Sequence, residues 1–260
     1  MEIVYFLLSQ KGIEISFEGC QNMRKIDIPE SMTEIKESAF SNCNLLKYIT
    51  IPVSIKIIGK SAFYNCFSLQ TIVIPPSVVE IADSTFMNCD KLTQITLPNS
   101  IITIGEKAFY NCKSLTNIVI PESVKSIKEY SFSKCNSLEQ IIIPSSVCDI
   151  GKNAFSECGF LKEVSIGSSI KILNSDVFSY CSLLSVVNFE EPSSLEVINK
   201  NAFAYCVFLT EISLPPSLKS IQNFAFNYCK ELSQVSIPSS VNNIDDSAFI
   251  NCPSIDIVYY

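Results

Sequence analysis

The sequence predicts a repeat solenoid, in which short coils of chain stack so that each coil adds one strand to a parallel β-sheet. Two observations support this fold class. A Phe followed three residues later by Cys occurs eleven times, and successive pairs are 23 residues apart at every step except one of 25. Each repeat also contains a short alternating apolar segment, which in most repeats ends at a proline. We therefore expect about eleven coils, with a parallel β-sheet on one face and short extended or 3₁₀ segments on the other.

The segment 138–144, LEQIIIP, shows why one strand is expected in each coil. Ile141 and Ile143 point to one side of an extended chain, whereas Gln140 and Ile142 point to the other, which is the two-residue period of a strand. Proline has no N–H group for a sheet hydrogen bond, so we expect Pro144 and its equivalents to end the strands.

The rest of each coil is expected to form a second short segment and a turn. The pattern V-x-x-I, as in Val147 and Ile150, indicates an extended or 3₁₀ segment that closes in a tight turn. The A-F-x-N-C piece that follows suits one helical turn, with Phe and Cys directed inward. In several coils a residue that tolerates a positive φ angle follows V-x-x-I, and we expect such an angle at Gly59, Gly105, Gly151, Asn174, Asn199 and Asp245.

A single solenoid is expected over residues 1–260, with residues 1–12 as a degenerate half-coil and residues 13–260 as the repeats. One coil buries too few apolar side chains to offset the conformational entropy of 23 ordered residues. Stacked coils share their apolar faces and fold together, so no internal domain boundary is expected.

The repeat L-x-x-I-x-I-P-x-S-V resembles the core of leucine-rich repeats, L-x-x-L-x-L-x-x-N. With A-F-x-N-C, the 23-residue form is similar to the BspA-like leucine-rich repeats of bacterial and protist surface proteins. This resemblance covers nearly the whole chain and implies a right-handed leucine-rich-repeat coil. Serine stands where the usual repeat has its ladder asparagine, and we expect its hydroxyl to hydrogen-bond to the turn backbone. These serines are Ser31, Ser54, Ser77, Ser100, Ser123, Ser146, Ser169, Ser194, Ser217 and Ser240.

Charge and hydropathy argue against nucleic acid and membrane partners. The formal net charge is -7 and no run of Lys or Arg exceeds two residues, so a phosphate backbone has no basic patch to bind. The longest apolar run near the start, residues 3–8, is far shorter than the roughly 20 residues of a membrane span. We expect neither nucleic acid binding nor membrane insertion.

No catalytic, cofactor-binding or metal-binding residues are expected, and the chain is not expected to be an enzyme. The sequence has no His, which removes Ser-His-Asp and Cys-His nucleophilic systems, and its 7 Gly are too scattered for a phosphate loop. Zinc needs four converging ligands, and the chain has no C-x-x-C spacing. Eleven of the 12 Cys occupy the repeat position and are expected to be buried as small hydrophobic groups, whereas Cys148 is expected to point outward.

The outward side chains of the predicted strands form a regular array, which we call the strand face. From Tyr48 to Ile142 this face carries no charge, so it would bind a partner by shape and hydrogen bonding. The alternative is an ordinary solvated sheet surface. The candidate partner-binding residues on it are Tyr48, Thr50, Thr71, Val73, Gln94, Thr96, Asn117, Val119, Gln140 and Ile142.

The largest irregularity in the repeats lies between Cys158 and Cys206. Gly167 replaces the turn proline, and one coil later the chain inserts two residues, so that Glu190 and Glu191 precede Pro192. Insertions in solenoids form loops on one face, which is often the binding face. We expect this acidic loop to rim the partner site, and a functionally neutral insertion is the alternative.

The leading hypothesis is a non-catalytic protein-recognition module, adhesin-like or surface-antigen-like by resemblance, that binds a protein or a glycan through the strand face. The alternative is a structural protein that self-associates end to end through uncapped terminal strands, because residues 1–12 and the final IDIVYY present sheet edges. The resemblance implies a cell-surface or extracellular location. The sequence itself indicates no signal peptide or anchor, so a cytoplasmic location is the alternative.

Overall fold

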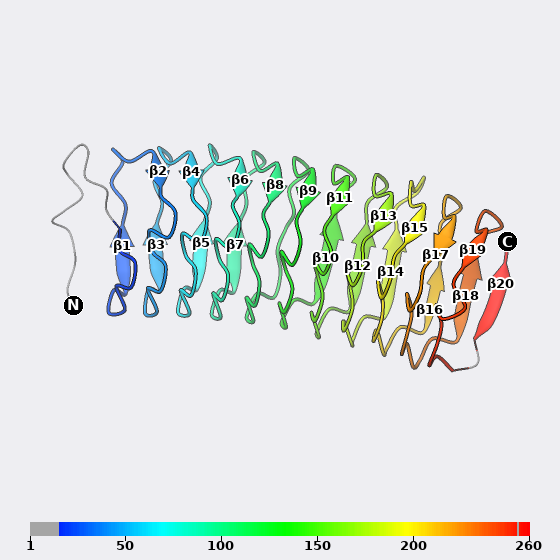
Figure 1. The fold of residues 1–260 in the computed structure, drawn as a ribbon. Helices are drawn as coiled ribbons and strands as arrows, with labels where there is room; N and C mark the ends of the chain where they lie inside the picture. Colours follow the sequence, from blue (N-terminus) through cyan, green and yellow to red (C-terminus); the bar gives the residue numbers. More distant parts are fainter. Residues whose placement is uncertain (1–15, 254) are drawn as a thin grey trace.

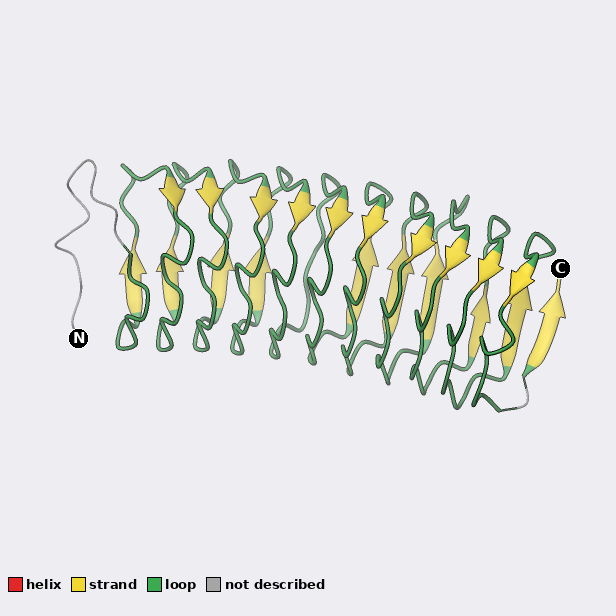
Figure 2. Cartoon of the chain, in the orientation of Figure 1, coloured by secondary structure: helices red, strands yellow, loops and turns green. Residues whose placement is uncertain are grey.

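The protein is a parallel β-solenoid of about ten coils (Figure 1). The structure is a computed structural model that describes residues 16–253 and 255–260. The coils stack along one axis, from β1 at one end to β20 at the other, and no helix occurs in the described residues (Figure 2). The fold class predicted from the repeat is confirmed.

The strands form two rows along the solenoid. The row that we call the long-strand row consists of β1 (Lys25–Asp27), β3 (Tyr48–Thr50), β5 (Thr71–Val73), β7 (Gln94–Thr96), β10 (Gln140–Ile143), β12 (Glu163–Ile166), β14 (Val186–Phe189), β16 (Glu211–Ser213), β18 (Gln234–Ile237) and β20 (Asp256–Tyr259). These strands carry the strand face.

The row that we call the short-strand row is formed by the V-x-x-I segments, which are extended as expected. Its two-residue strands are β2 (Glu34–Ile35), β4 (Ile57–Ile58), β6 (Glu80–Ile81), β8 (Thr103–Ile104), β9 (Ser126–Ile127), β11 (Asp149–Ile150), β13 (Ile172–Leu173), β15 (Val197–Ile198), β17 (Ser220–Ile221) and β19 (Asn243–Ile244).

Strands of successive coils pair in parallel, and the sequence repeat sets their register. Gln140 lies opposite Glu163 and Ile141 opposite Val164, so equivalent residues of neighbouring coils are partners. Hydrogen bonding along the long-strand row is interrupted, however, which gives the groups β1-β3, β5-β7, β10-β12-β14 and β16-β18-β20.

One expected strand, at residues 117–119, is not formed, so that prediction is wrong. The inward and outward alternation is kept, because Ile118 is buried while Asn117 and Val119 are exposed. Burial of the apolar side chains Ile118 and Ile120 therefore orients this segment without strand pairing.

The core is a column of phenylalanine rings with a column of cysteines beside it. Neighbouring rings from Phe17 to Phe249 are stacked, with centroids 5.1 to 5.5 Å apart. Each repeat cysteine from the second coil onward donates a hydrogen bond to the Phe carbonyl of the previous coil, as from Cys158 Sγ to Phe132 O at 3.1 Å. The expected burial of the repeat cysteines is confirmed except near the ends, where Cys20 is exposed and Cys252 is half-buried. The buried thiols also act as hydrogen-bond donors to backbone carbonyls.

The A-F-x-N-C piece forms successive turns, so the expected helical turn is wrong. Two residues have positive φ angles in each of these turns from Ser38 to Tyr228, for example Ser61 at 53° and Asn65 at 59°. This geometry directs their amides out of the coil, so that Ser61 N donates to Asp83 O and Asn65 N to Met87 O of the next coil, at 3.0 and 2.9 Å. A helical turn would use these amides within its own coil and would leave the neighbouring carbonyls unpaired.

The positive φ angles expected after V-x-x-I are not found, and the glycines there have a different role. A Cβ atom on Gly151 would lie 2.4 Å from the backbone N of Glu129 in the previous coil, and Gly59 and Gly105 show similar approaches of 2.5 and 2.7 Å. These positions favour glycine because two coils touch there. None of the expected positions has a positive φ angle: Gly59, Gly105, Gly151, Asn174, Asn199 and Asp245.

The repeat serines bond to backbone of the preceding coil. Ser123 Oγ donates to Ile101 O and Ser240 Oγ to Leu218 O, both at 2.7 Å. The expected bond from serine to backbone is therefore present in these coils, although it joins two coils. It does not form everywhere, because the buried hydroxyls of Ser54 and Ser146 have no partner among the described residues.

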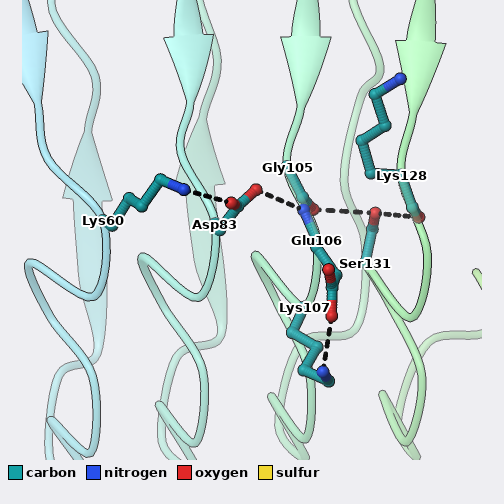
Figure 3. A network of polar contacts seen from close by, with 7 residues as sticks. All are labelled: Lys60, Asp83, Gly105, Glu106, Lys107, Lys128 and Ser131. Atoms are coloured by element: carbon teal, nitrogen blue, oxygen red, sulfur yellow. Dashed lines mark hydrogen bonds and ion pairs between the residues drawn. The ribbon is translucent and has the colours of Figure 1, made fainter.

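Polar side chains also join coils on the surface after the short-strand row (Figure 3). Lys60 Nζ lies 2.8 Å from Asp83 Oδ2, and Asp83 Oδ1 accepts a hydrogen bond of 2.9 Å from Glu106 N in the following coil. Ser131 Oγ donates to Gly105 O at 3.0 Å and also contacts Lys128 O. Asp83 thus connects three successive coils.

The close contact between coils at Gly151 predicts an intolerance to any side chain. Gly151→Ala should lower the free energy of unfolding by about 1–3 kcal/mol, because the new Cβ would force two backbones apart. The matched control is Gly159→Ala, since the nearest atom to a Cβ there is Ser182 Oγ at 3.9 Å. Urea denaturation of both variants checks this, and equal stabilities would contradict it.

The Asp83 network predicts a pH-dependent contribution to stability. The hydrogen bond from Lys60 lowers the pKa of Asp83, and the amide of Glu106 acts in the same direction against partial burial. A lowered pKa means that this stabilisation is present above the ordinary carboxyl pKa of about 4 and is lost as the pH falls below it. Asp83→Asn should therefore melt at a lower temperature than the parent at pH 7, and the difference should shrink below about pH 4.

The control for this network is Lys60→Gln. If the ion pair carries the effect, Lys60→Gln should reproduce most of the loss, and the double variant should lose little more than either single variant. A melting difference that does not change with pH would show that Asp83 acts without its charge.

The cysteine column predicts three classes of thiol reactivity. Cys20 and Cys148 are exposed, Cys252 is half-buried, and the other nine cysteines are buried. Burial raises the pKa of Cys43 to about 12 and also raises the pKa of Cys89 and Cys206, so their reactive thiolates are scarce at neutral pH. Native labelling with a thiol reagent should modify Cys20 and Cys148 quickly, Cys252 more slowly and the rest only on unfolding. Rapid labelling of all 12 Cys in the folded protein would contradict this core.

Candidate functional site

The strand face is exposed and in register along the solenoid. Because neighbouring coils align residue by residue, its side chains form two columns. One column contains Tyr48, Thr71, Gln94, Asn117 and Gln140, and the other contains Thr50, Val73, Thr96, Val119 and Ile142. All ten residues are exposed, as the alternation predicts.

The first column is polar and the second is largely apolar. Tyr48 Oη donates to Gln70 Oε1 at 2.7 Å. Within the described residues, the side-chain amides of Gln94, Asn117 and Gln140 make no hydrogen bond, and all three side chains are exposed to solvent. In the second column Val73, Val119 and Ile142 are 65%, 74% and 67% exposed. Free amides beside exposed aliphatic groups are a surface suited to macromolecular contacts.

A shallow depression of about 590 Å³ lies where the sheet is interrupted between β7 and residues 117–119. Its lining includes Thr93, Gln94, Thr96, Asn117 and Val119. Four of the predicted partner-binding residues therefore surround one hollow in the middle of the strand face.

The acidic loop begins in register with the preceding coil, because the amide of Glu190 donates to Ile166 O at 2.9 Å. Glu190 contacts the hydroxyl of Ser145, 45 residues earlier in the chain, and Ser145 Oγ also lies 2.7 Å from Ser168 Oγ. Glu191 instead accepts a hydrogen bond of 2.9 Å from Ser193 N within its own turn. The two acidic residues, both exposed, therefore have different positions.

A second depression, of about 370 Å³, brings Glu190 together with Ile142, although 48 residues separate them in the sequence. Gly167 lies in the same wall, where a Cβ would be 2.5 Å from the carbonyl carbon of Pro144. Replacement of the turn proline by glycine thus lets two coils approach closely at this depression.

A third depression, of about 300 Å³, lies between β14 and β16, where the long-strand row is again interrupted. Its lining is mainly polar and includes Asn188, Glu211, Ser213, Gln234 and Ser236. Sequence reasoning did not include these residues among the candidates.

Sequence reasoning also missed a ladder of asparagine side chains on the turns. Asn65 Nδ2 donates to Asn42 Oδ1 at 2.9 Å, and Asn88 and Asn111 continue the ladder with bonds of 2.8 Å. Each of these residues has a positive φ angle, which asparagine adopts more readily than most residues. The signal was present in the repeat as the N of A-F-x-N-C.

The same turn position later in the chain carries a tyrosine column. The rings of Tyr180 and Tyr205 stack with centroids 4.4 Å apart, and those of Tyr205 and Tyr228 with centroids 4.9 Å apart. Because the rings cover one another, this column joins coils in the way the asparagine ladder does earlier in the chain.

The described residues offer no cluster of His, Cys, Asp and Glu that could hold a metal ion. Cys148 is exposed, as expected from its outward position, and its amide donates to Lys125 O at 2.9 Å. In the described part of the chain no helix is long and apolar enough to span a membrane.

End-to-end self-association is expected to use the two ends of the stack. Residues 1–12 lie outside the described residues. β20 pairs with β18 and lies at the edge of its sheet, and Val258 and Tyr259 are exposed. End-to-end association through this edge stays a prediction.

Comparison with known proteins gives a family match and several similar folds. The family described as the BspA type leucine rich repeat region matches residues 13–135, 102–207 and 185–260. A search of the curated proteins gave no match.

Among solved structures, a leucine-rich repeat protein from Bacteroides ovatus is 26% identical, with 94% of this chain and 85% of that chain covered and a TM-score of 0.55. One from Eubacterium ventriosum is 26% identical, with 91% and 78% covered and a TM-score of 0.62. The leucine-rich repeat protein of T. pallidum is 28% identical, with 72% and 78% covered and a TM-score of 0.52. Because the family match spans nearly all of the repeats described above, the chain belongs to the BspA-type leucine-rich repeat family.

Proposed function

We propose that this protein is a non-catalytic recognition module that binds a protein partner through the strand face. The observation that carries the proposal is the pair of exposed columns from Tyr48 to Ile142, in which free amides stand beside aliphatic side chains. The buried Phe and Cys columns hold this surface in place, so little ordering is needed when a partner binds.

The chemistry of the strand face favours a protein over the alternatives. Val73, Val119 and Ile142 supply apolar area of the kind that protein interfaces bury, and the neighbouring amides supply directional hydrogen bonds. A glycan is the alternative ligand for the amides. The net charge of -7 disfavours a phosphate backbone.

The chain belongs to the BspA-type repeat family. Its resemblance to the BspA-like repeats of bacterial and protist surface proteins supports an adhesin-like or surface-antigen-like role at the cell surface. Catalysis has no support in the residues of the face, which provide amides, hydroxyls and aliphatic groups without a nucleophile and base pair.

Charged substitutions on the strand face should abolish partner capture. The triple variant Gln94→Arg, Asn117→Arg and Gln140→Arg replaces three exposed amides by unpaired cations, which would be costly to bury in an interface. We expect capture of the partner from cell extracts, quantified by mass spectrometry, to fall about tenfold or more.

The matched control places three arginines on the short-strand side, as Ile57→Arg, Val79→Arg and Ile102→Arg, at positions that are also exposed. This variant should capture the partner normally. If the strand-face variant folds and still captures the partner, or if only the control loses capture, the proposed face is wrong.

A further inference from the structure

The depression beside the acidic loop has a composition that restricts what it can bind. It lies along the three hydrogen-bonded strands β10, β12 and β14, which form an uninterrupted part of the long-strand row. Its volume is about 370 Å³, and its lining is formed mainly by Glu122, Ile142, Gly167, Asn188 and Glu190, with segments of the adjoining turns.

The apolar part of the lining is formed by Ile142 and Phe189, and the coils that carry it are firmly held together. Ile142 is 67% exposed on β10, and Phe189 at the end of β14 is half-buried against the core. Gly167 donates its amide to Ile143 O at 2.8 Å, which holds the neighbouring coil against the wall. An aliphatic chain that packs against Ile142 would remove apolar surface of both groups from water, which favours binding.

The rim supplies hydrogen-bond acceptors and negative charge. Glu190 is held on one side by the hydroxyl of Ser145, and its amide donates to Ile166 O at 2.9 Å, so the carboxylate stays at the rim. Glu122 carries a second exposed carboxylate. Asn188 Nδ2 donates to Glu163 Oε1 at 3.0 Å, which leaves the Asn188 carbonyl oxygen free to accept.

The lining of the depression contains no lysine or arginine. Two carboxylates therefore stand at its rim without a cation from this group of residues. An anionic ligand would be repelled there, and a neutral ligand would leave both charges unused.

We propose that this depression receives a lysine or arginine side chain from an extended segment of a protein partner. Such a side chain has an aliphatic stem that fits over Ile142 and a cationic end with only donors, which matches the acceptors of Glu122, Glu190 and Asn188. The inference rests on the proposed function, because the depression lies at one end of the uncharged part of the strand face. It adds the chemistry of the partner, which is a basic residue at this position.

The test uses a defined probe, a fluorescein-labelled oligoarginine peptide of about six residues, and fluorescence anisotropy with the full chain. We expect binding at low ionic strength that weakens toward about 150 mM salt, as screening requires. An oligoglutamate peptide of the same length should not bind.

Three variants locate the binding. Glu122→Gln with Glu190→Gln should weaken binding about fivefold or more, because both charged acceptors are removed while the shapes are kept. The matched control is Glu34→Gln with Glu80→Gln, which removes the same charge from exposed residues of the short-strand row and should change the affinity less than about twofold. Ile142→Ser keeps the charge and should weaken binding about threefold, because the stem loses its apolar contact.

Absence of peptide binding, or an equal loss in the two double Gln variants, would overturn the proposal. Failure of the proposed function gives a different result. The peptide would still bind, and Glu122→Gln with Glu190→Gln would still weaken that binding, but the arginine triple variant of the strand face would capture the partner as the parent does.

A third outcome separates the two proposals in the other direction. If the arginine triple variant loses capture of the partner while Glu122→Gln with Glu190→Gln captures the partner as the parent does, the strand face is the site and the basic residue of the partner is not needed.

Discussion

The register between coils is the constraint on which the rest of the structure depends. Successive coils must lie at sheet distance over their whole length, so every residue meets its equivalent in the next coil. Phe then stacks on Phe, each repeat thiol meets the same carbonyl, and the turns place every second amide against the following coil. Where the backbones of two coils approach most closely a Cβ would collide with the neighbouring coil, which explains glycine at Gly151.

The same register turns a repeated core into a varied surface. Inward positions must repeat, because each must fit its neighbours in the column, whereas outward positions of the strands touch only solvent and their flanking side chains. The chain can therefore change Gln94 to Asn117 in the next coil, or Val73 to Thr96, at little cost to stability. This separation lets a rigid scaffold present an amide column and an aliphatic column side by side.

Departures from the repeat place charge at one end of this uncharged surface. Gly167 allows a close approach of two coils, and Glu190, which follows β14 directly, contacts Ser145 two coils earlier. The amide of Glu190 donates to Ile166 O as that of Gly167 does to Ile143 O, so Glu190 occupies the column that holds Pro144 and Gly167 in the two preceding coils. The change from proline to glycine to glutamate in this column gives a depression that differs chemically from the middle of the strand face.

The sequence alone determined the coil length, the parallel stacking and the inward direction of the repeated Phe, Cys and Ile residues. It also determined the outward direction of residues such as Gln140 and Ile142. All of these follow from the sequence period, because equivalent residues of stacked coils must lie side by side. Tertiary structure decided what depends on distances between coils. Gly151 is a contact point and not a left-handed residue, and residues 117–119 keep their alternation without strand pairing. The repeat contains the asparagine of the ladder, but its hydrogen bonds depend on the positive φ angles that bring Asn65 Nδ2 to Asn42 Oδ1. The repeat places Glu190 two coils and two residues beyond Ile142, but only the structure shows that both line one depression, because a depression depends on the directions of side chains in neighbouring coils.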